Sequence, residues 1–350
     1  MAGFVASMAA MLWLALPGDT LERRLERSER GDPLTIAYLR ARLAAAPGEL
    51  ALHLALARQL IGAGDLDRAL AALARPLAEG PPELRHSAGW LRLEILERRA
   101  FAERQAESVR QASLAQLRAQ LRALAASESD AALGAPGLAA LQRRASAAGD
   151  PGLALELLRR RAALGAPAGT DPHPWLAGAA ADAAALGDAS LAAALHWRAF
   201  DASADDGVRR AHFLAAIGLL RSADRVADAL AQAGERLDRL RADTALMRFM
   251  VRLALEAGRP DLADRYAREM LRFALLDALD ALAAAPEAVL RRVSSDAPAE
   301  PARPRLPFDE EAYTLAWQVF LANRNLADAY EVAASAVRQA PGALEWRRRL

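Results

Sequence analysis

Apolar residues recur at helical spacing on both sides of a short break in the stretch "LALEAGRPDLADRYA", Leu253 to Ala267. Residues three and four positions apart are leucine, alanine and tyrosine, which is the pattern of two amphipathic helices. Glycine readily takes the left-handed conformation that ends a helix, and proline is tolerated in the first turn of the next one. The pattern therefore predicts that Gly258 closes one helix and that Pro260 begins another.

The same break recurs along the chain, each time with a leucine four residues after the glycine. The clear copies stand at Gly149, Gly187 and Gly258. The stretch "RSADRVADAL" fits between the last two with Ser222 in the glycine position, so that the four positions are 38, 35 and 36 residues apart. Looser copies start at Gly64 and at Asn323, and asparagine tolerates the left-handed conformation. A helix–turn–helix period in the mid-thirties predicts an all-α, tetratricopeptide-type helical-repeat solenoid without strands.

Large side chains follow these breaks at helical spacing, and we expect them to fill the core between repeats. Tyr266 and Met270 are four residues apart, and the alanines around them allow two helices to approach closely. Leu262 is expected to be buried between repeats in the same way. The same interpretation covers five further aromatic residues: Trp197, Phe200, Tyr313, Trp317 and Phe320.

The periodicity divides the chain into four segments. Residues 31–290 are predicted to form the solenoid, and within them Leu84 to Ala126 favours one or two long amphipathic helices. Residues 291–308 are predicted to be a linker or an excursion, because the stretch Ser294 to Phe308 is rich in proline. Residues 309–350 read as further repeat helices, with the repeat pattern cut short at Leu350.

The first segment is predicted to be a membrane anchor, at residues 1–18. Its uncharged run Ala2 to Leu16 is shorter than the roughly 20 residues that a membrane span needs. A buried first helix is the alternative. The run is followed by arginines that would lie on the cytoplasmic side by the positive-inside rule, so the orientation of the anchor stays open.

Composition narrows the function classes. The 45 basic and 44 acidic residues give a net charge of +1, which argues against a nucleic-acid partner. Every basic residue is arginine, so mechanisms that need a catalytic or phosphate-binding lysine are excluded. With no cysteine, the chain has no disulfide and no thiolate nucleophile.

The motifs of catalysis are not found in the sequence. The histidines form no H-E-x-x-H pair; His196 is expected to be a packed or surface residue, and His173, in "DPHPW", to face solvent. The glycine pattern at Gly62 lacks the strand and the third glycine of a dinucleotide loop. Asp205 and Asp206 read as the acid pair of a helix end. We therefore predict a non-enzymatic protein with no cofactor and no metal.

Three stretches carry a resemblance to a known family. They are "GDPLTIAYLRARLAAAPGELALHLALARQLIGAGDLDRAL" (Gly31 to Leu70), "WLRLEILERRAFA" (Trp90 to Ala102) and "EEAYTLAWQVFLANRNLADAYEVAASAVRQAPGALEWRRRL" (Glu310 to Leu350). This set resembles the amino-terminal tetratricopeptide-repeat region of the PelB family, which secretes the bacterial Pel exopolysaccharide. The resemblance implies a protein of Gram-negative bacteria that is anchored in the inner membrane and extends through the periplasm to an outer-membrane barrel. It also implies that the repeats contact the Pel deacetylase/hydrolase.

Two functions follow as hypotheses. The first is a periplasmic scaffold for exopolysaccharide export and biofilm formation, tethered to the inner membrane through residues 2–16. It would bind the polysaccharide deacetylase/hydrolase, and the polysaccharide is a further possible ligand. The second is a cytosolic peptide-binding adaptor. An α/α-barrel glycan enzyme is disfavoured, because the period is too short and no carboxylate pair is placed. In either hypothesis we expect the first helices of the repeats to line a concave binding face.

Overall fold

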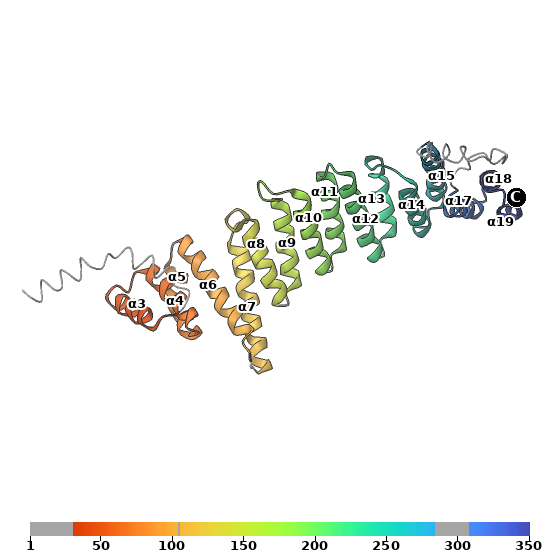
Figure 1. The fold of residues 1–350 in the computed structure, drawn as a ribbon. Helices are drawn as coiled ribbons and strands as arrows, with labels where there is room; N and C mark the ends of the chain where they lie inside the picture. Colours follow the sequence, from red (N-terminus) through yellow and green to blue (C-terminus); the bar gives the residue numbers. More distant parts are fainter. Residues whose placement is uncertain (1–30, 104–105, 284–307) are drawn as a thin grey trace, which may run out of the picture. The chain divides into compact units, whose positions relative to one another are not determined.

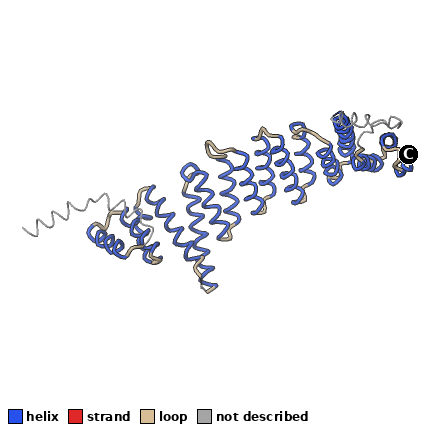
Figure 2. Tube along the Cα trace, viewed as in Figure 1, coloured by secondary structure: helices blue, strands red, loops and turns tan. Residues whose placement is uncertain are grey.

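Helices make up all of the regular structure in the described residues. The computed structural model describes residues 31–103, 106–283 and 308–350. Within these ranges every regular element is a helix (Figure 2), as the sequence predicted. The chain divides into two compact units, Met1–Gly165 and Ala166–Leu350. The loop at their boundary contains Gly165 and Gly169, which both have positive φ.

Unit 1 consists of seven described helices (Figure 1). Its helices are α3 (Pro33–Ala45), α4 (Leu50–Gly62), α5 (Leu66–Glu79), α6 (Pro82–Ala100), α7 (Glu107–Ser127), α8 (Asp130–Ala147) and α9 (Pro151–Leu164). The long amphipathic stretch from Leu84 to Ala126 therefore forms two helices, α6 and α7, which was one of the two expected outcomes. Helix α8 is kinked at Gly134, where φ is 60°.

Unit 2 begins after the boundary loop. Its elements are α10 (Pro172–Ala185), α11 (Ala189–Ala202), α12 (Asp206–Ser222), α13 (Val226–Gly234), the 3-10 helix η1 (Leu237–Arg239), α14 (Thr244–Glu256), α15 (Pro260–Ala283), α17 (Glu310–Ala322), α18 (Leu326–Gln339) and α19 (Leu344–Arg349). Helices α17 to α19 share one core with α11 to α15. Residues 309–350 are thus part of the same compact unit as residues 166–283.

One turn geometry joins the two helices of six pairs. After each first helix, a single residue has positive φ: Gly64, Gly149, Gly187, Asp224, Gly258 and Arg324. The amide of the next residue donates to a carbonyl in the last turn of the first helix, at 2.8 to 3.0 Å in all six pairs. This six-residue closure is the Schellman motif, which satisfies a carbonyl that a helix end leaves unpaired. The predicted role of Gly64, Gly149, Gly187 and Gly258 is confirmed.

The residue after the turn starts the second helix of the pair. In four pairs its side chain caps the new helix by accepting a hydrogen bond from a backbone amide three residues later. These residues are Asp65, Asp150, Asp188 and Asn325, which are preferred capping types. In the other two pairs this residue is Arg225 or Arg259, and each is bonded to an aspartate of the first turn, Asp228 or Asp261, at 2.7 Å.

Two predicted turn positions were wrong. Ser222 is the last residue of α12, and the left-handed residue is Asp224, two positions later (φ 57°). Asn323 is also a helix-end residue, with φ −83°, and Arg324 takes the left-handed conformation (φ 58°). The prediction rested on the leucine four residues after each glycine, but a different residue is common to all six pairs.

The residue common to all six pairs is an alanine five residues after the left-handed residue. All six of these alanines are at most 3% exposed: Ala69, Ala154, Ala192, Ala229, Ala263 and Ala329. A side chain this small lets the second helix pack closely on its neighbour. When the repeats are aligned on this alanine, Asp224 and Arg324 occupy the turn position.

Most of the predicted core residues are buried. Tyr266, Met270, Trp197 and Phe200 are in the core of unit 2, and so are Tyr313 and Phe320. Leu262 and Trp317 were expected in the same core but are only partly buried and pack against its edge. Trp346 of α19 is fully buried and closes this core.

The predicted anchor at residues 1–18 and residues 291–307 of the predicted linker lie outside the described residues. Among residues 31–103, 106–283 and 308–350, no helix is long and apolar enough to cross a bilayer.

The turn geometry predicts opposite effects for two glycine-to-alanine substitutions in the α10–α11 pair. Gly187 has φ +84°, and a Cβ atom added to it would have nothing within 4 Å, so Gly187→Ala adds backbone strain without a clash. We expect it to lower the free energy of unfolding by about 1–2 kcal/mol. Gly178 lies within α10, also with nothing within 4 Å, and Gly178→Ala should raise that free energy by roughly 0.5–1 kcal/mol. Chemical denaturation of the full chain measures both.

The reverse substitution at Arg324 is the control. Arg324→Gly relieves a left-handed arginine, so we expect it to be neutral or to stabilise unit 2 by up to about 1 kcal/mol. Equal destabilisation by Gly187→Ala and Gly178→Ala would contradict the assignment of the turn.

Candidate functional site

The six helix pairs can be compared with one another, and one pair differs at a buried position. Eight residues after the left-handed residue, five pairs have an apolar or aromatic residue that is buried, and the α12–α13 pair has Gln232. The set is Ala72, Leu157, Leu195, Gln232, Tyr266 and Val332. A polar side chain costs free energy in such a position unless it is hydrogen-bonded. Gln232 of α13 is therefore expected to have a hydrogen-bond partner.

Two histidines are further exceptions of the same kind. His196 of α11 stands nine residues after its left-handed residue, where other pairs have Leu73, Leu158, Ala233, Ala267 and Ala333. His212 of α12 stands twelve residues before Asp224, the left-handed residue of its pair. At the equivalent position four other pairs have leucine, alanine or tryptophan, and one has glycine. Three polar exceptions thus fall on three consecutive helices, α11, α12 and α13.

The histidines meet in the structure. The Nδ1 atoms of His196 and His212 are 3.1 Å apart, a hydrogen bond in which one ring donates and the other accepts. The ring of His173, from the start of α10, lies 6.0 Å from that of His212 between centroids. His173 is bonded to Asp171 at 3.1 Å and its side chain is 32% exposed, so it faces solvent only in part. His196 is packed, as expected.

Burial controls the protonation of this pair. Burial, and secondly the nearby His212, lower the pKa of His196. Burial, and secondly His173, lower the pKa of His212. Both rings are therefore held in the neutral form more firmly than a solvated histidine. In the described ranges, no three histidine, aspartate or glutamate side chains are placed to hold a metal ion.

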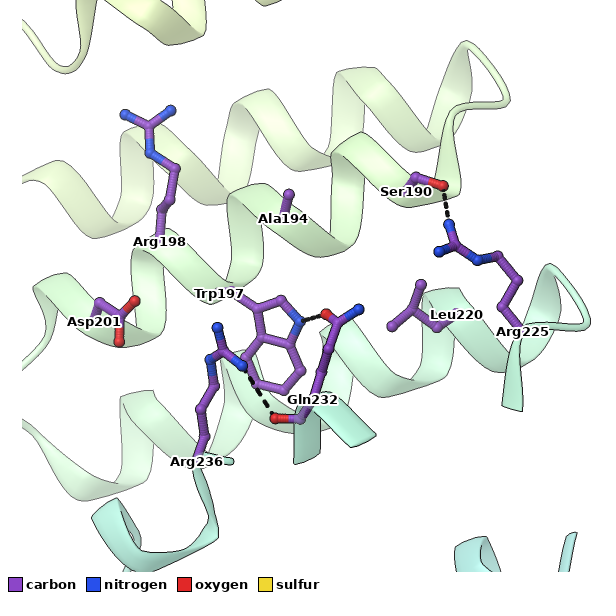
Figure 3. Close-up of a pocket in the computed structure, with 9 residues that line it drawn as sticks. All are labelled: Ser190, Ala194, Trp197, Arg198, Asp201, Leu220, Arg225, Gln232 and Arg236. Atoms are coloured by element: carbon purple, nitrogen blue, oxygen red, sulfur yellow. Dashed lines mark hydrogen bonds between the residues drawn. The ribbon is translucent and has the colours of Figure 1, made fainter. Parts of the chain in front are cut away.

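Residues of α11, α12 and α13 line an open cleft of about 320 Å³ (Figure 3). The lining residues are Ser190, Ala194, Trp197, Arg198, Asp201, Leu220, Arg225, Gln232 and Arg236. Trp197 occupies a helix position that is solvent-exposed in most of the other pairs, yet it is only 4% exposed. It is covered by Gln232 and Arg236 from the following pair.

Trp197 organises the polar groups of the cleft. Its indole nitrogen donates to Oε1 of Gln232 at 2.6 Å. The guanidinium of Arg236 lies over its ring, 4.7 Å from the centroid, a cation–π contact. Arg236 also donates to the carbonyl of Gln232 at 3.1 Å, which fixes both residues of the next pair against Trp197.

The other charged groups at the rim are also held in place. Arg225 donates to the hydroxyl of Ser190 on the neighbouring pair and to Asp228. Asp201 accepts from Arg239, whose guanidinium lies 5.0 Å from the centroid of the Phe200 ring. The cleft is consequently preorganised, with three arginines and one aspartate among its lining residues.

A second groove, of about 740 Å³, lies between α15, α17 and α18. Its Arg268 is bonded to Asp328 and to Asp264, and its Gln339 donates to the Tyr313 hydroxyl. These groups already satisfy one another. Its lining has no counterpart of the polar exception at Gln232, because Val332 occupies the equivalent position.

The sequence pattern predicted the role of some of these residues but not of others. Asp205 does cap a helix, since it accepts from the amide of Val208 at 2.8 Å. Gly64 and Asp65 of the supposed dinucleotide pattern form a helix turn and its cap. The histidine pair and the Gln232 exception were missed. Aligning the repeats on the buried alanine would have shown both as polar residues in apolar positions.

No family model matches this chain, and no curated protein matches its sequence. Among solved structures, the chain is similar to one in the crystal structure of the APC/C hetero-tetramer Cut9-Hcn1, with 11% identity over 92% of this chain and a TM-score of 0.26. It spans 52% of that chain. A circular tandem repeat protein matches with 18% identity, 96% and 90% coverage of the two chains, and a TM-score of 0.25. The TPR domain of P58(IPK) matches with 14% identity, 90% coverage of each chain, and a TM-score of 0.21. Likenesses at these TM-scores carry no information about function.

The lowered pKa values of His196 and His212 predict that unit 2 loses stability in acid. The unfolded chain takes up protons near the ordinary histidine pKa of 6.5, while the folded pair does so only at lower pH. The contribution is therefore complete above about pH 6.5 and declines as the pH falls below it. Thermal unfolding between about pH 8 and pH 5 measures the decline.

The variant His212→Leu tests the origin of this effect, because two other pairs have leucine at the equivalent position. It should reduce the loss of stability in acid. His53→Gln, in unit 1, serves as the control and should leave that loss unchanged. A pH dependence that survives unaltered in His212→Leu would show that other groups cause it.

Proposed function

We propose that this protein is a non-catalytic scaffold that binds a partner protein through the cleft around Trp197. One observation carries the proposal: Trp197 and arginines from successive helix pairs are fixed around an open cleft. Arginine is enriched where proteins bind one another tightly, and Trp197, which is itself covered, holds Arg236 in place. Because the groups are already held by hydrogen bonds, little side-chain entropy is lost when a partner binds.

The chemistry of the cleft supports a binding role over a catalytic one. Ser190 is the hydroxyl in the lining, and it accepts a hydrogen bond from Arg225. Arginine stays protonated in proteins and cannot accept a proton, so it does not activate the hydroxyl as a nucleophile. The polar groups are therefore suited to recognition.

We place this scaffold in Pel-type exopolysaccharide export. The support is the resemblance of Gly31 to Leu70, Trp90 to Ala102 and Glu310 to Leu350 to the PelB family. On this proposal the protein is periplasmic, is tethered to the inner membrane through residues 2–16, and binds the polysaccharide deacetylase/hydrolase. Contact with the polysaccharide itself is a further part of the proposal.

A pull-down tests the function. The full chain is immobilised and presented with the purified deacetylase/hydrolase encoded beside its gene, at moderate salt. We expect capture, and we expect the double variant Arg225→Glu, Arg236→Glu to lose most of it, because opposite charge at an interface repels the original partner.

The matched control is the double variant Arg40→Glu, Arg58→Glu, which makes the same change in charge on exposed residues of unit 1. It should capture the enzyme normally. If the wild-type chain does not capture the enzyme and fractionates with the cytosol, the Pel assignment is wrong and the peptide-binding adaptor is favoured.

A further inference from the structure

The side-chain amide of Gln232 is the donor that the cleft presents to a ligand. An indole nitrogen can only donate a hydrogen bond, so the amide oxygen of Gln232 has to face Trp197. The amide nitrogen then points to the opposite side, as Figure 3 shows. Within the described part of the chain this nitrogen has no hydrogen-bond partner, although Gln232 is partly buried.

The charges around this donor favour an anion. Arg198, Arg225 and Arg236 line the cleft together with Asp201, so the lining has more positive than negative charge. Arg236 is fixed over Trp197 and uses only one of its terminal nitrogens in the bonds to the Gln232 carbonyl and to Glu235. Its other N–H groups make no hydrogen bond to another residue in the described part of the chain, and in Figure 3 the guanidinium lies on the other side of the Trp197 ring from the Gln232 amide nitrogen.

From this arrangement we infer that the cleft binds the carboxylate of an aspartate or glutamate side chain from an acidic segment of the partner protein. The inference rests on the proposed function and names the chemistry that the partner presents. The carboxylate accepts from Nε2 of Gln232, and the positive charge of the arginines that line the cleft attracts it. Ala194 and Leu220 give its methylene groups an apolar surface.

A carboxylate fits this cleft better than a phosphate. The phosphate of a phosphorylated residue carries close to two negative charges and suits a cluster of arginines without an acid. Here the central donor is a neutral amide and Asp201 is part of the lining, which disfavours a dianion.

The decisive variant is Gln232→Glu, which keeps the shape of the side chain. A glutamate oxygen still accepts from Trp197 and so preserves the packing, while the second oxygen replaces the amide nitrogen and repels a carboxylate. Gln116→Glu is the matched control, because it makes the same charge change at an exposed position of α7 in unit 1.

Fluorescence anisotropy with the full chain measures binding of a labelled peptide of alternating glutamate and alanine. The same peptide with glutamine in place of glutamate is the control ligand. We expect the glutamate peptide to bind, more weakly as salt is raised, and Gln232→Glu to weaken it at least about tenfold. Gln116→Glu should bind as the wild type does. Thermal unfolding checks that both variants fold.

Three outcomes would overturn the inference: equal binding by Gln232→Glu, equal binding of the glutamine peptide, or stronger competition by inorganic phosphate than by acetate. The pull-down separates this failure from that of the proposed function. If Gln232→Glu captures the deacetylase/hydrolase as well as the wild type, the scaffold function stands and the carboxylate site is wrong. If the acidic peptide binds but the enzyme is not captured, the site stands and its assigned partner is wrong.

Discussion

The structure depends on one hydrogen-bonded turn that closes six helix pairs in the same way. A residue with positive φ lets the following amide reach a carbonyl in the last turn of the first helix, and this bond sets the direction of the second helix. The second helix can then pack closely on its neighbouring helix only if the residue where the two helices cross is small. This accounts for alanine at the same buried position in all six pairs. The turn and the alanine together fix which side chains of each pair face the core.

Polar contacts between successive pairs reinforce this register. Arg210 of α12 is bonded to Asp243, which also caps α14 through the amide of Leu246. That arginine, through its hydrogen bond, is the main reason that the pKa of Asp243 is lowered. Farther along, Thr244 donates to Asp277 and Arg248 to Asp309, at 2.7 Å in each case. The bonds of Arg210 and Arg248 each join one pair to the next, whereas the bond of Thr244 joins the two helices of the α14–α15 pair.

The sequence predicted the helices and most of the turns because their determinants are local. Gly149, Gly187 and Gly258 reveal the turn through their own conformational freedom, and Pro260 through its place in a first helical turn. Arg324 was missed because arginine is not a typical left-handed residue, and Asp224 was missed because the leucine spacing pointed to Ser222, although aspartate takes this conformation more readily than most residues. The boundary between the units, at Gly165 and Gly169, carries a turn signal that does not belong to the repeat. The meeting of His173, His196 and His212 depends on how three helices cross, which local spacing does not determine.

The position of the cleft follows from the same geometry. The sequence led us to expect recognition along the first helices of the repeats, but most of the lining residues come from α11, α13 and the turn after α13. Trp197 explains this difference, because it places a large ring at a position where the equivalent side chains of other pairs are small or charged. Gln232 and Arg236 cover that ring by contacts with its nitrogen and its face. A polar residue became tolerable in an apolar position of α13 because the tryptophan supplied its hydrogen-bond donor. The cleft therefore results from two departures from the repeat, Trp197 in the α10–α11 pair and Gln232 in the α12–α13 pair. Each of these side chains is the hydrogen-bond partner of the other.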